Sequence, residues 1–338
     1  MREQPLVNIL IVALFLAVFV GGCDRSSPEN PEENAQETET SQTDLDEADT
    51  AALSPENNHT QPAPALLENP ATPPALREGQ EGYELFHAGD RAMMRGDFET
   101  AIAAFSKVSK LHPDNVEILR ALAEALTIAE QYDRAVASYQ EILEISENDI
   151  NALYNLAVTL TRLNDLHQAE DYYRQLLAHD PDHDRARYNL AVVYQALGKL
   201  SAAREEWREY IKANDSDAGA YMHLAEVLLE SGLTEQALEY LKKASMLAPD
   251  DLTMQLNLAA AARAAGSYGW AAVALKRAVE LAPGDADVWA DLGEVMLAIY
   301  RQTERQDHLT EAINAWKESL RIDPNQPQLQ EYLQTYEQ

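Results

Sequence analysis

The sequence predicts an all-α fold, a solenoid of stacked helical hairpins, and three observations lead to that prediction. Residues 82–326 repeat one pattern seven times, and the first six copies follow one another at a constant period of 34. Small residues recur at two fixed positions of each copy, with bulky apolar residues at helical spacing between them. Proline or an acidic residue closes each copy. A period of this length with two helical patterns is typical of a helix-turn-helix solenoid.

The copies occupy residues 82–115, 116–149, 150–183, 184–217, 218–251, 252–285 and 286–326. The eighth position, in the first helical pattern, is small in every copy: Gly89, Ala123, Ala157, Ala191, Ala225, Ala259 and Gly293. The twentieth, in the second pattern, is always alanine: Ala101, Ala135, Ala169, Ala203, Ala237, Ala271 and, after a seven-residue insertion somewhere around 300–307, Ala312. Small side chains let two helices approach closely, so each copy is expected to be a hairpin.

The second helix of each copy has a recognisable end. Proline stands just beyond it in five copies, at Pro113, Pro181, Pro249, Pro283 and Pro324, and a proline cannot continue a helix. Glu147 and Asp215 take its place in copies two and four. The tail 327–338 has Leu329, Tyr332 and Leu333 on one side, which predicts a capping helix, because terminal repeats need a polar outer face.

These copies in register resemble the tetratricopeptide repeat (TPR) family over about three quarters of the chain, in their small, aromatic, alanine and proline positions. The resemblance implies a right-handed α-solenoid in which the first helix of each repeat lines a concave groove. It also implies that the second, fifth, sixth, ninth, twelfth and thirteenth positions of that helix point into the groove. Function would then come from binding at this surface.

The ninth of the implied groove positions is apolar in copies three and four. The ninth position is acidic in copies one, two, five and seven but is Val158 and Val192 here. The sixth position carries asparagine in copies three, four and six, and an amide can bond both the donor and the acceptor of a peptide backbone. Aromatic residues and arginine dominate many interfaces. The expected peptide-binding residues are Arg120, Tyr154, Asn155, Val158, Arg162, Arg185, Tyr188, Asn189, Val192 and Asn257. The alternative is that the asparagine row reflects repeat consensus.

The N-terminal segment has the pattern of an export signal. Residues 6–20 are apolar except for Asn8, a run shorter than a comfortable membrane span, and Gly21, Gly22 and Cys23 follow. Residues 20–23 resemble the bacterial lipobox, which implies that 1–22 is a signal peptide and that Cys23, the only cysteine, is lipidated. An uncleaved helical anchor is the alternative. Both place the solenoid in the cell envelope outside the cytoplasm, and Asp24 slightly favours the inner (plasma) membrane over the outer one.

Residues 23–81 are expected to form an acidic, disordered linker. From Asp24 to Glu81 the chain has 14 Asp or Glu against two Arg and no Lys, with many Pro, Ser, Thr, Asn and Gln. Such a segment buries too little apolar surface to offset its ordering entropy. The whole chain has a formal net charge of -31, which argues against nucleic acid as a partner.

Motifs for chemistry are missing from the sequence. It has no phosphate-cradling glycine loop, nucleophile elbow or HExxH motif, so we expect neither enzymatic activity, cofactor nor small-molecule substrate. His179 and His183, with the aspartates between them, have donor types that could hold a divalent metal, but packing and capping in an inter-repeat turn is the favoured interpretation. His87 and His223 share a helix position, where a structural or ligand-contacting role is expected.

The sequence therefore predicts a membrane-tethered, non-catalytic scaffold. It would bind a protein or peptide segment, whose identity the residues do not reveal, and support assembly or localisation of an envelope complex. The second hypothesis is an accessory or adaptor subunit of an envelope enzyme system, such as a protease adaptor or a cytochrome maturation factor. A metal-dependent activity at His179 and His183 is the third and weakest hypothesis.

Overall fold

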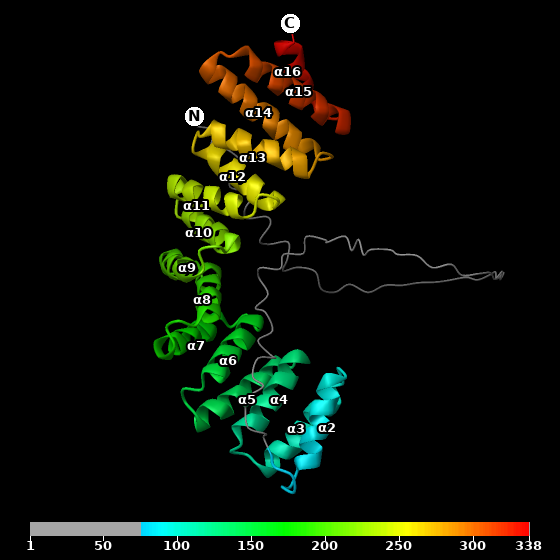
Figure 1. Cartoon of the computed structure of the whole chain (residues 1–338), viewed down its shortest axis with the longest axis vertical. Coiled ribbons are helices and arrows are strands. Elements are labelled where there is room, and N and C mark those ends of the chain that lie inside the picture. Colours follow the sequence, from blue (N-terminus) through cyan, green and yellow to red (C-terminus); the bar gives the residue numbers. More distant parts are fainter. Residues whose placement is uncertain (1–75, 338) are drawn as a thin grey trace, which may run out of the picture. The chain divides into compact units, whose positions relative to one another are not determined.

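The computed structural model describes residues 76–337, which contain fifteen α-helices and no strand. Figure 1 shows these helices following one another in chain order from α2 to α16. The helical-repeat solenoid expected from the sequence is confirmed. The predicted signal peptide, Cys23 and the linker up to residue 75 lie outside the described residues, as does residue 338. Within residues 76–337 no helix combines the length and the apolarity needed to cross a bilayer.

The helices form seven hairpins, and we call the first helix of each hairpin an A helix and the second a B helix. The A helices are α2 (Tyr83–Met94), α4 (Val116–Ile128), α6 (Ile150–Arg162), α8 (Asp184–Ala196), α10 (Ala218–Glu230), α12 (Leu252–Ala264) and α14 (Ala286–Thr303). The B helices are α3 (Phe98–Leu111), α5 (Tyr132–Ile145), α7 (Leu166–His179), α9 (Leu200–Ala213), α11 (Thr234–Leu247), α13 (Tyr268–Leu281) and α15 (Gln306–Ile322). The last helix, α16 (Pro327–Tyr336), stands alone after α15.

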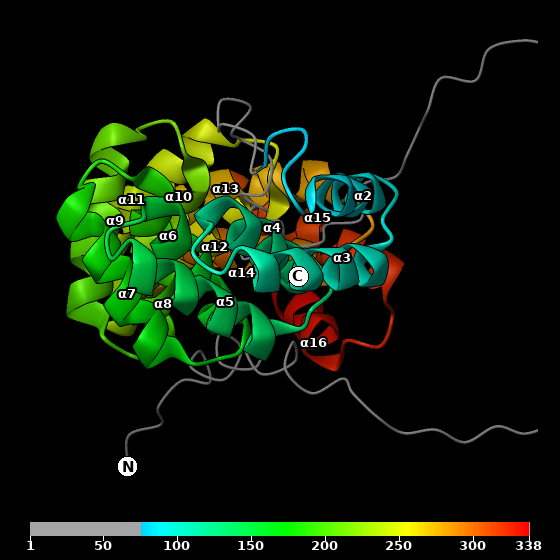
Figure 2. The same ribbon diagram turned by 90° about the horizontal axis from the view of Figure 1, so that it is seen from below.

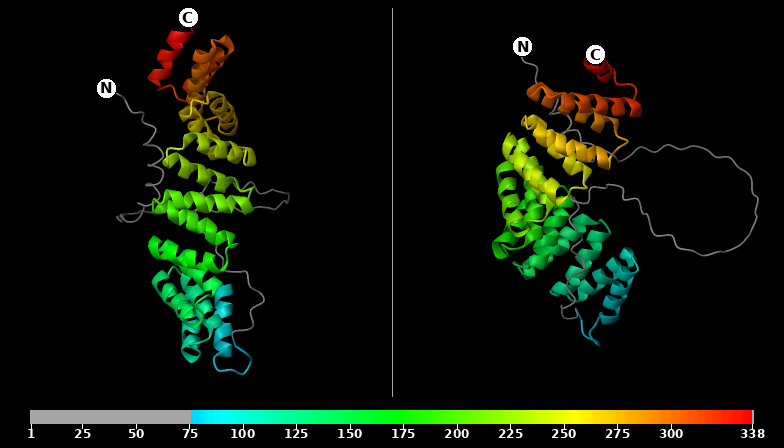
Figure 3. Two further views of the ribbon diagram at one scale, coloured as in Figure 1. Left: turned by 90° about the vertical axis from the view of Figure 1, so that its left-hand side faces the viewer. Right: turned by 45° about the horizontal axis from the view of Figure 1, so that its top comes forward.

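Contacts run almost entirely between neighbours in the chain. Each B helix packs against the A helix of its own copy and, up to α13, against the A helix of the next copy, while α15 packs against α16 (Figure 3). The buried apolar residues therefore form one continuous core cluster, divided among the junctions rather than gathered at a centre. This is the packing expected of a repeat protein, in which each unit buries its apolar surface only against adjacent units.

The small residues lie where helices approach most closely. Ala123 and Ala157 at the eighth position and Ala135 and Ala169 at the twentieth are fully buried. The first copy has glycine at the eighth position because a Cβ atom at Gly89 would come within 2.6 Å of the Phe105 ring. Glycine in the seventh copy has the same cause, since a Cβ atom there would overlap the indole of a B-helix tryptophan.

One residue position caps all the A helices from α4 to α14. The last residue of each copy accepts a hydrogen bond from a backbone N–H in the first turn of the next A helix, which satisfies a donor that the helix leaves unpaired. The capping residues are Asn115, Asp149, His183, Asp217, Asp251 and Asp285. Five of the six are the common Asn or Asp cap, and the sixth, His183, accepts through Nδ1 at 3.1 Å from the amide of Ala186.

The turn between the two helices of a hairpin uses a left-handed residue. In copies one to six the fifteenth residue has a positive φ, and in four of them it is glycine: Gly96, Gly198, Gly232 and Gly266. Copies two and three place Glu130 at φ 57° and Asn164 at φ 60° in the same conformation. A residue in the left-handed conformation ends a helix and redirects the chain. Glycine adopts this conformation without strain because it has no Cβ atom, asparagine tolerates it, and most other residues are strained there.

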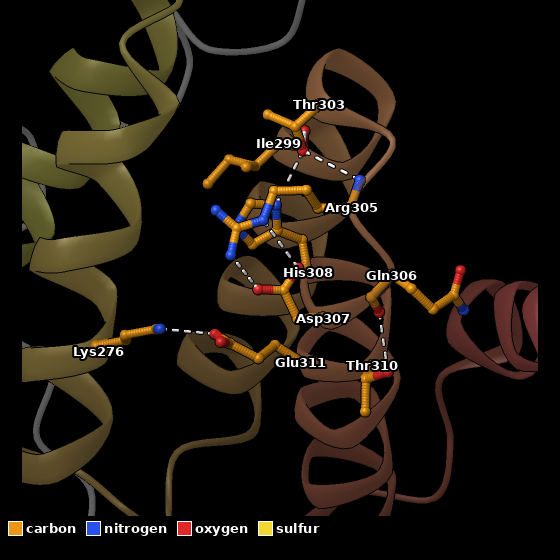
Figure 4. A network of polar contacts seen from close by, with 9 residues as sticks. All are labelled: Lys276, Ile299, Thr303, Arg305, Gln306, Asp307, His308, Thr310 and Glu311. Atoms are coloured by element: carbon orange, nitrogen blue, oxygen red, sulfur yellow. Dashed lines mark hydrogen bonds and ion pairs between the residues drawn. The ribbon is translucent and has the colours of Figure 1, made fainter.

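The insertion predicted at 300–307 lengthens both helices of the seventh copy. Helix α14 has 18 residues where α12 has 13, and α15 has 17 where α13 has 14. Figure 4 shows the turn that joins them, where Thr303 donates to the carbonyl of Ile299 at 2.9 Å and Arg305 pairs with Asp307 at 2.5 Å. The same figure shows Lys276 of α13 paired with Glu311 of α15 at 2.6 Å, a link between copies six and seven.

Helix α16 covers the last B helix. Its buried Leu329 and half-buried Tyr332 pack towards α15, and Tyr332 lies 5.2 Å from the Trp316 ring. Helix α16 carries Gln330 and Gln334 at the fourth and eighth positions, where α6 has Leu153 and Ala157. In an A helix these positions pack against the B helix of the same copy. In α16 they are polar and face outward, as a capping helix requires. Figure 2 views the molecule from the end that carries α2 and α3.

Candidate peptide-binding face

The candidate site is the surface of two adjacent A helices, α6 and α8, which contact each other directly as well as through α7. We call it the central face and define it by Asn155, Val158, Arg162, Arg185, Tyr188, Asn189 and Val192. Arg162 and Arg185 are exposed, and Asn155, Tyr188, Asn189 and Val192 are half-buried. Val158 is only 9% exposed, so it forms the floor of the face rather than its outer surface.

Tyr154 lies beneath the central face. Its side chain is 5% exposed, its ring stacks on His183 at 5.2 Å, and its edge meets Tyr173 at 6.3 Å between centroids. The Asn189 side chain donates to the Tyr154 hydroxyl at 3.2 Å. Burial raises the pKa of Tyr154, and the hydrogen bond from Asn189 opposes that rise. Tyr154 therefore offers little of its own area and instead orients Asn189 from below.

Tyr188 belongs to an aromatic cluster that the sequence analysis did not identify. Its ring lies edge-on to Trp207 at 4.8 Å and to Tyr210 at 5.4 Å, and His223 stacks on Trp207 at 5.0 Å. Burial is also the main reason that the pKa of Tyr188 is raised. Recurrence at the twenty-fourth position was the available signal, because that position carries a ring in five copies: Phe105, Tyr139, Tyr173, Trp207 and Trp316 after the insertion.

The asparagines of the sixth position differ in their hydrogen bonds. Asn189 is engaged with Tyr154, as described above, whereas the side-chain amides of Asn155 and Asn257 form no hydrogen bond within residues 76–337. Both are half-buried on A helices. An amide in this position has a donor and an acceptor available to a ligand, and leaving them without partners in an interface would be costly.

The three expected arginines are held differently. Arg120 is bound inside the protein, to Glu117 and Asp149 at 2.7 Å each, so most of its guanidinium is already occupied. Arg162 reaches only the hydroxyl of Tyr132, at 3.4 Å. The side chain of Arg185 forms no hydrogen bond or ion pair with any residue that the structure describes. The central face therefore presents one unpaired guanidinium, at the start of α8.

Acidic residues border the central face on both sides. In copy two, burial raises the pKa of Glu124 to about 7, against the attraction of Arg120. In copy five, Glu226 bonds His223 at 3.0 Å, and the pKa of Glu230 is raised by burial and by the nearby charge of Glu226. The first copy repeats the histidine–carboxylate pair, between His87 and Asp90 at 3.1 Å. Carboxylates on these A helices are thus partly shielded from water.

Two other candidate places lie outside the central face. His183 is occupied as a helix cap and ring partner, His179 is exposed at the end of α7, and residues 76–337 contain no group of three metal-binding side chains. A pocket of about 560 Å³ lies beside the turn between α3 and α4, lined by Leu76, His112 and Pro113 among others. None of the predicted binding residues lines it.

The fold and this face define an all-helical solenoid with an interaction surface on its A helices. Models of the tetratricopeptide repeat match residues 86–150, 193–251 and 224–286, and a second model of that repeat matches 160–221. Together they cover more than half of the chain, which belongs to the tetratricopeptide repeat family. Members of this family generally act as protein-interaction modules, and no catalytic family is indicated. No curated protein matches the chain.

Solved structures share the fold. The C-terminal part of a TPR repeat-containing protein from Cytophaga hutchinsonii has a TM-score of 0.58 at 18% identity, covering 73% of this chain and 98% of that one. A tetratricopeptide repeat protein from Parabacteroides merdae has a TM-score of 0.52 at 19% identity, with 77% and 100% covered. The protein MamA is 26% identical over 50% of this chain and 92% of its own, with a TM-score of 0.48.

Proposed function

We propose that this chain is a non-catalytic scaffold that binds a protein or peptide segment across the central face. The observation that carries the proposal is the set of unpaired polar groups on neighbouring A helices. The amide of Asn155 and the guanidinium of Arg185 have no partner within residues 76–337. On the same helices the apolar Val158 follows Asn155 by one turn and Val192 follows Arg185 by two turns. Apolar contacts beside convergent polar groups are the composition of a binding site.

The chemistry of these groups indicates how a segment would bind. An extended backbone offers alternating N–H and C=O groups, which the amides of Asn155 and Asn189 can match without reading side chains. Arg185 would take a carboxylate or a backbone carbonyl of the ligand, and its planar fork favours a carboxylate. The half-buried rim of Tyr188 and the side chain of Val192 would cover apolar ligand groups.

We further propose that the chain is held at a bacterial cell-envelope membrane through a lipid on Cys23, on the extracytoplasmic side. The support is the sequence alone: an apolar run at 6–20, the lipobox-like residues 20–23 and an acidic linker before the repeats. A flexible linker of this length has a root-mean-square reach of about 40 Å, enough to let the central face meet partners near the membrane. Assembly or localisation of an envelope complex is the role that follows.

Chemical cross-linking in the producing cells, followed by mass spectrometry of the attached proteins, tests the binding proposal. The double variant Asn155→Ala, Arg185→Ala should lower recovery of one partner at least tenfold, since two polar contacts of about 1 kcal/mol or more each are removed. Arg174→Ala is the matched control, because Arg174 is an exposed arginine on the B helix α7. Equal recovery from the double variant and the control would refute binding at this face.

The tether is tested separately. Mass spectrometry of the mature protein should find an N-terminus at Cys23 carrying acyl chains, and Cys23→Ala should release the chain from washed membranes. An intact leader with a free thiol would refute lipidation and leave the binding proposal untouched. The identity of the recovered partner also separates an assembly scaffold from a subunit that serves an enzyme.

A further inference from the structure

The B-helix side of copies five and six carries an apolar patch that no other copy has. Trp270 and Val273 of α13 and Met246 of α11 are 41%, 59% and 68% exposed. We call these three residues the outer patch. Large side chains with this much exposed apolar area are unusual on a soluble surface when they lie together.

Comparison between copies shows how distinctive the outer patch is. In the other copies the position of Trp270 is Thr100, Arg134, Gln168, Ala202, Gln236 or, allowing for the insertion, Glu311. The position of Val273 is correspondingly Ala103, Ala137, Asp171, Glu205, Glu239 or Asn314. Both positions are thus small or polar elsewhere. Packing within the solenoid therefore does not require an apolar residue at either place.

Two interactions between α13 and the α11 segment place the patch residues side by side. The Lys242 ammonium of α11 lies 4.9 Å from the centre of the Trp270 ring, and Arg277 of α13 pairs with Asp250 just beyond α11. Met246 is one turn past Lys242, and Val273 is one turn before Arg277. The methionine and the valine therefore lie at the same level along the two helices, between these interactions.

The charge around the outer patch indicates what covers it. Residues 234–281 contain five basic and five acidic residues, a balance of zero, in a chain whose net charge is -31. The two cations next to the patch already have carboxylate partners: Lys242 bonds Glu239 at 2.7 Å, and Arg277 bonds Glu280 at 2.6 Å. Nothing in this region attracts a strongly charged partner of either sign. A second copy of the same acidic chain, which would be repelled elsewhere, meets no net repulsion here.

We propose that the outer patch is the contact between two copies of this chain, related by a two-fold axis. Such a contact is isologous, so one apolar patch with a balanced charged border serves both copies. Met246, Trp270 and Val273 of each copy are then covered by the same residues of the other. The dimer leaves the central face, on the A helices, available to its ligand, and it does not depend on that ligand being bound.

Photo-cross-linking of the full chain in the producing cells tests this directly. A benzophenone amino acid at position 273 should give a covalent product of about twice the mass of the protein present in the cells, containing only this sequence. The matched control carries the same amino acid at position 137, because Ala137 is exposed on α5 at the same position of copy two. No dimer should form from position 137.

Second-site variants identify the contact chemically. With the cross-linker at position 273, Trp270→Gln or Met246→Lys should each lower the dimer yield at least tenfold, since each removes a large apolar contact. Met94→Gln removes a side chain that is 88% exposed on α2 and should leave the yield unchanged. Absence of the dimer, or cross-links from position 273 to another protein or to lipid instead, would overturn the proposal. Either result leaves binding at the central face standing.

Discussion

Gly293 is tied to one large side chain. A Cβ atom at this position of α14 would overlap Nε1 of Trp316, whose indole is fully buried. We expect Gly293→Ala to lower the free energy of unfolding by about 1–3 kcal/mol, because the ring must move within a closed junction. Chemical unfolding followed by far-ultraviolet circular dichroism measures the loss.

The chain offers a matched control for that substitution. Gly269 is also helical, in the first turn of α13, but a Cβ atom there would meet nothing within 4 Å. Gly269→Ala should be neutral or stabilise by about 0.5 kcal/mol, since alanine restricts the unfolded chain more. If both alanine variants behaved alike, the close approach of α14 and α15 would not explain the glycine.

Glu124 predicts a pH dependence. Burial raises its pKa from 4.5 to about 7, so ionising it costs the folded state free energy. The protonated Glu124 carboxyl contributes fully to the free energy of unfolding below pH 4.5, and this contribution is lost as the pH rises through about 7. Glu124→Gln removes that cost, and after discounting for partial exposure we expect it to raise the free energy of unfolding at pH 8 by about 1–2 kcal/mol. At pH 4.5 the gain should be much smaller.

Urea unfolding at the two pH values gives the comparison. Glu141→Gln serves as the control, because Glu141 is exposed on α5 and its side chain forms no hydrogen bond among residues 76–337. It should change the stability little at either pH. A gain from Glu124→Gln that is equal at both pH values would show that its ionisation is not the cause.

The binding residues show what sequence alone can reveal at this scale. The pattern identified Asn155, Asn189 and Arg185, and the structure places them on α6 and α8, two A helices that contact each other. It did not reveal that Tyr154 is almost wholly buried, because the residues that contact it lie far along the chain: His183 at the end of the same copy and Asn189 in the following copy. Burial at a junction depends on side chains about 30 residues apart, which no local pattern reports.

The turns make a prediction at the scale of an element. Glu130 adopts φ 57° at the turn between α4 and α5, where four other copies have glycine. Glu130→Gly should stabilise the protein by about 0.5–1 kcal/mol, because it removes the strain of a Cβ atom in the left-handed region. Ala129→Gly is the control, since Ala129 has φ -77° and should lose stability instead. Opposite signs in thermal unfolding would support the turn geometry, and equal signs would contradict it.

Helices were the most predictable feature, and for a clear reason. The small positions and the closing prolines recur every 34 residues, so the A helices α4 to α14 begin at the first residue of their copies. The left-handed residue at the fifteenth position escaped the sequence analysis because Glu130 and Asn164 interrupt the glycines. The sequence pattern predicted an insertion but not its division, whereas the structure shows that both α14 and α15 are longer than α12 and α13.

At the scale of the whole molecule, contacts between successive helices predict local rather than global responses. Helices α14 to α16 make no substantial contact with α4 to α6. Gly293→Ala should therefore speed amide hydrogen exchange in α14, α15 and α16 and leave α4, α5 and α6 unchanged, because repeats are coupled only to their neighbours. Exchange measured by mass spectrometry resolves these segments. Faster exchange throughout residues 76–337 would indicate a single cooperative unit instead.

The central claim is that a partner lies on the A helices of copies three and four. Its most direct test places a photo-cross-linking amino acid at position 151, since Asn151 is exposed on α6 at the position that Arg185 occupies in α8. We predict one cross-linked protein from position 151, none of it from the control position 137, and at least a tenfold lower yield when Asn155→Ala and Asn189→Ala are added. The same protein captured equally from both positions, or a yield that the asparagine variants leave unchanged, would contradict the account.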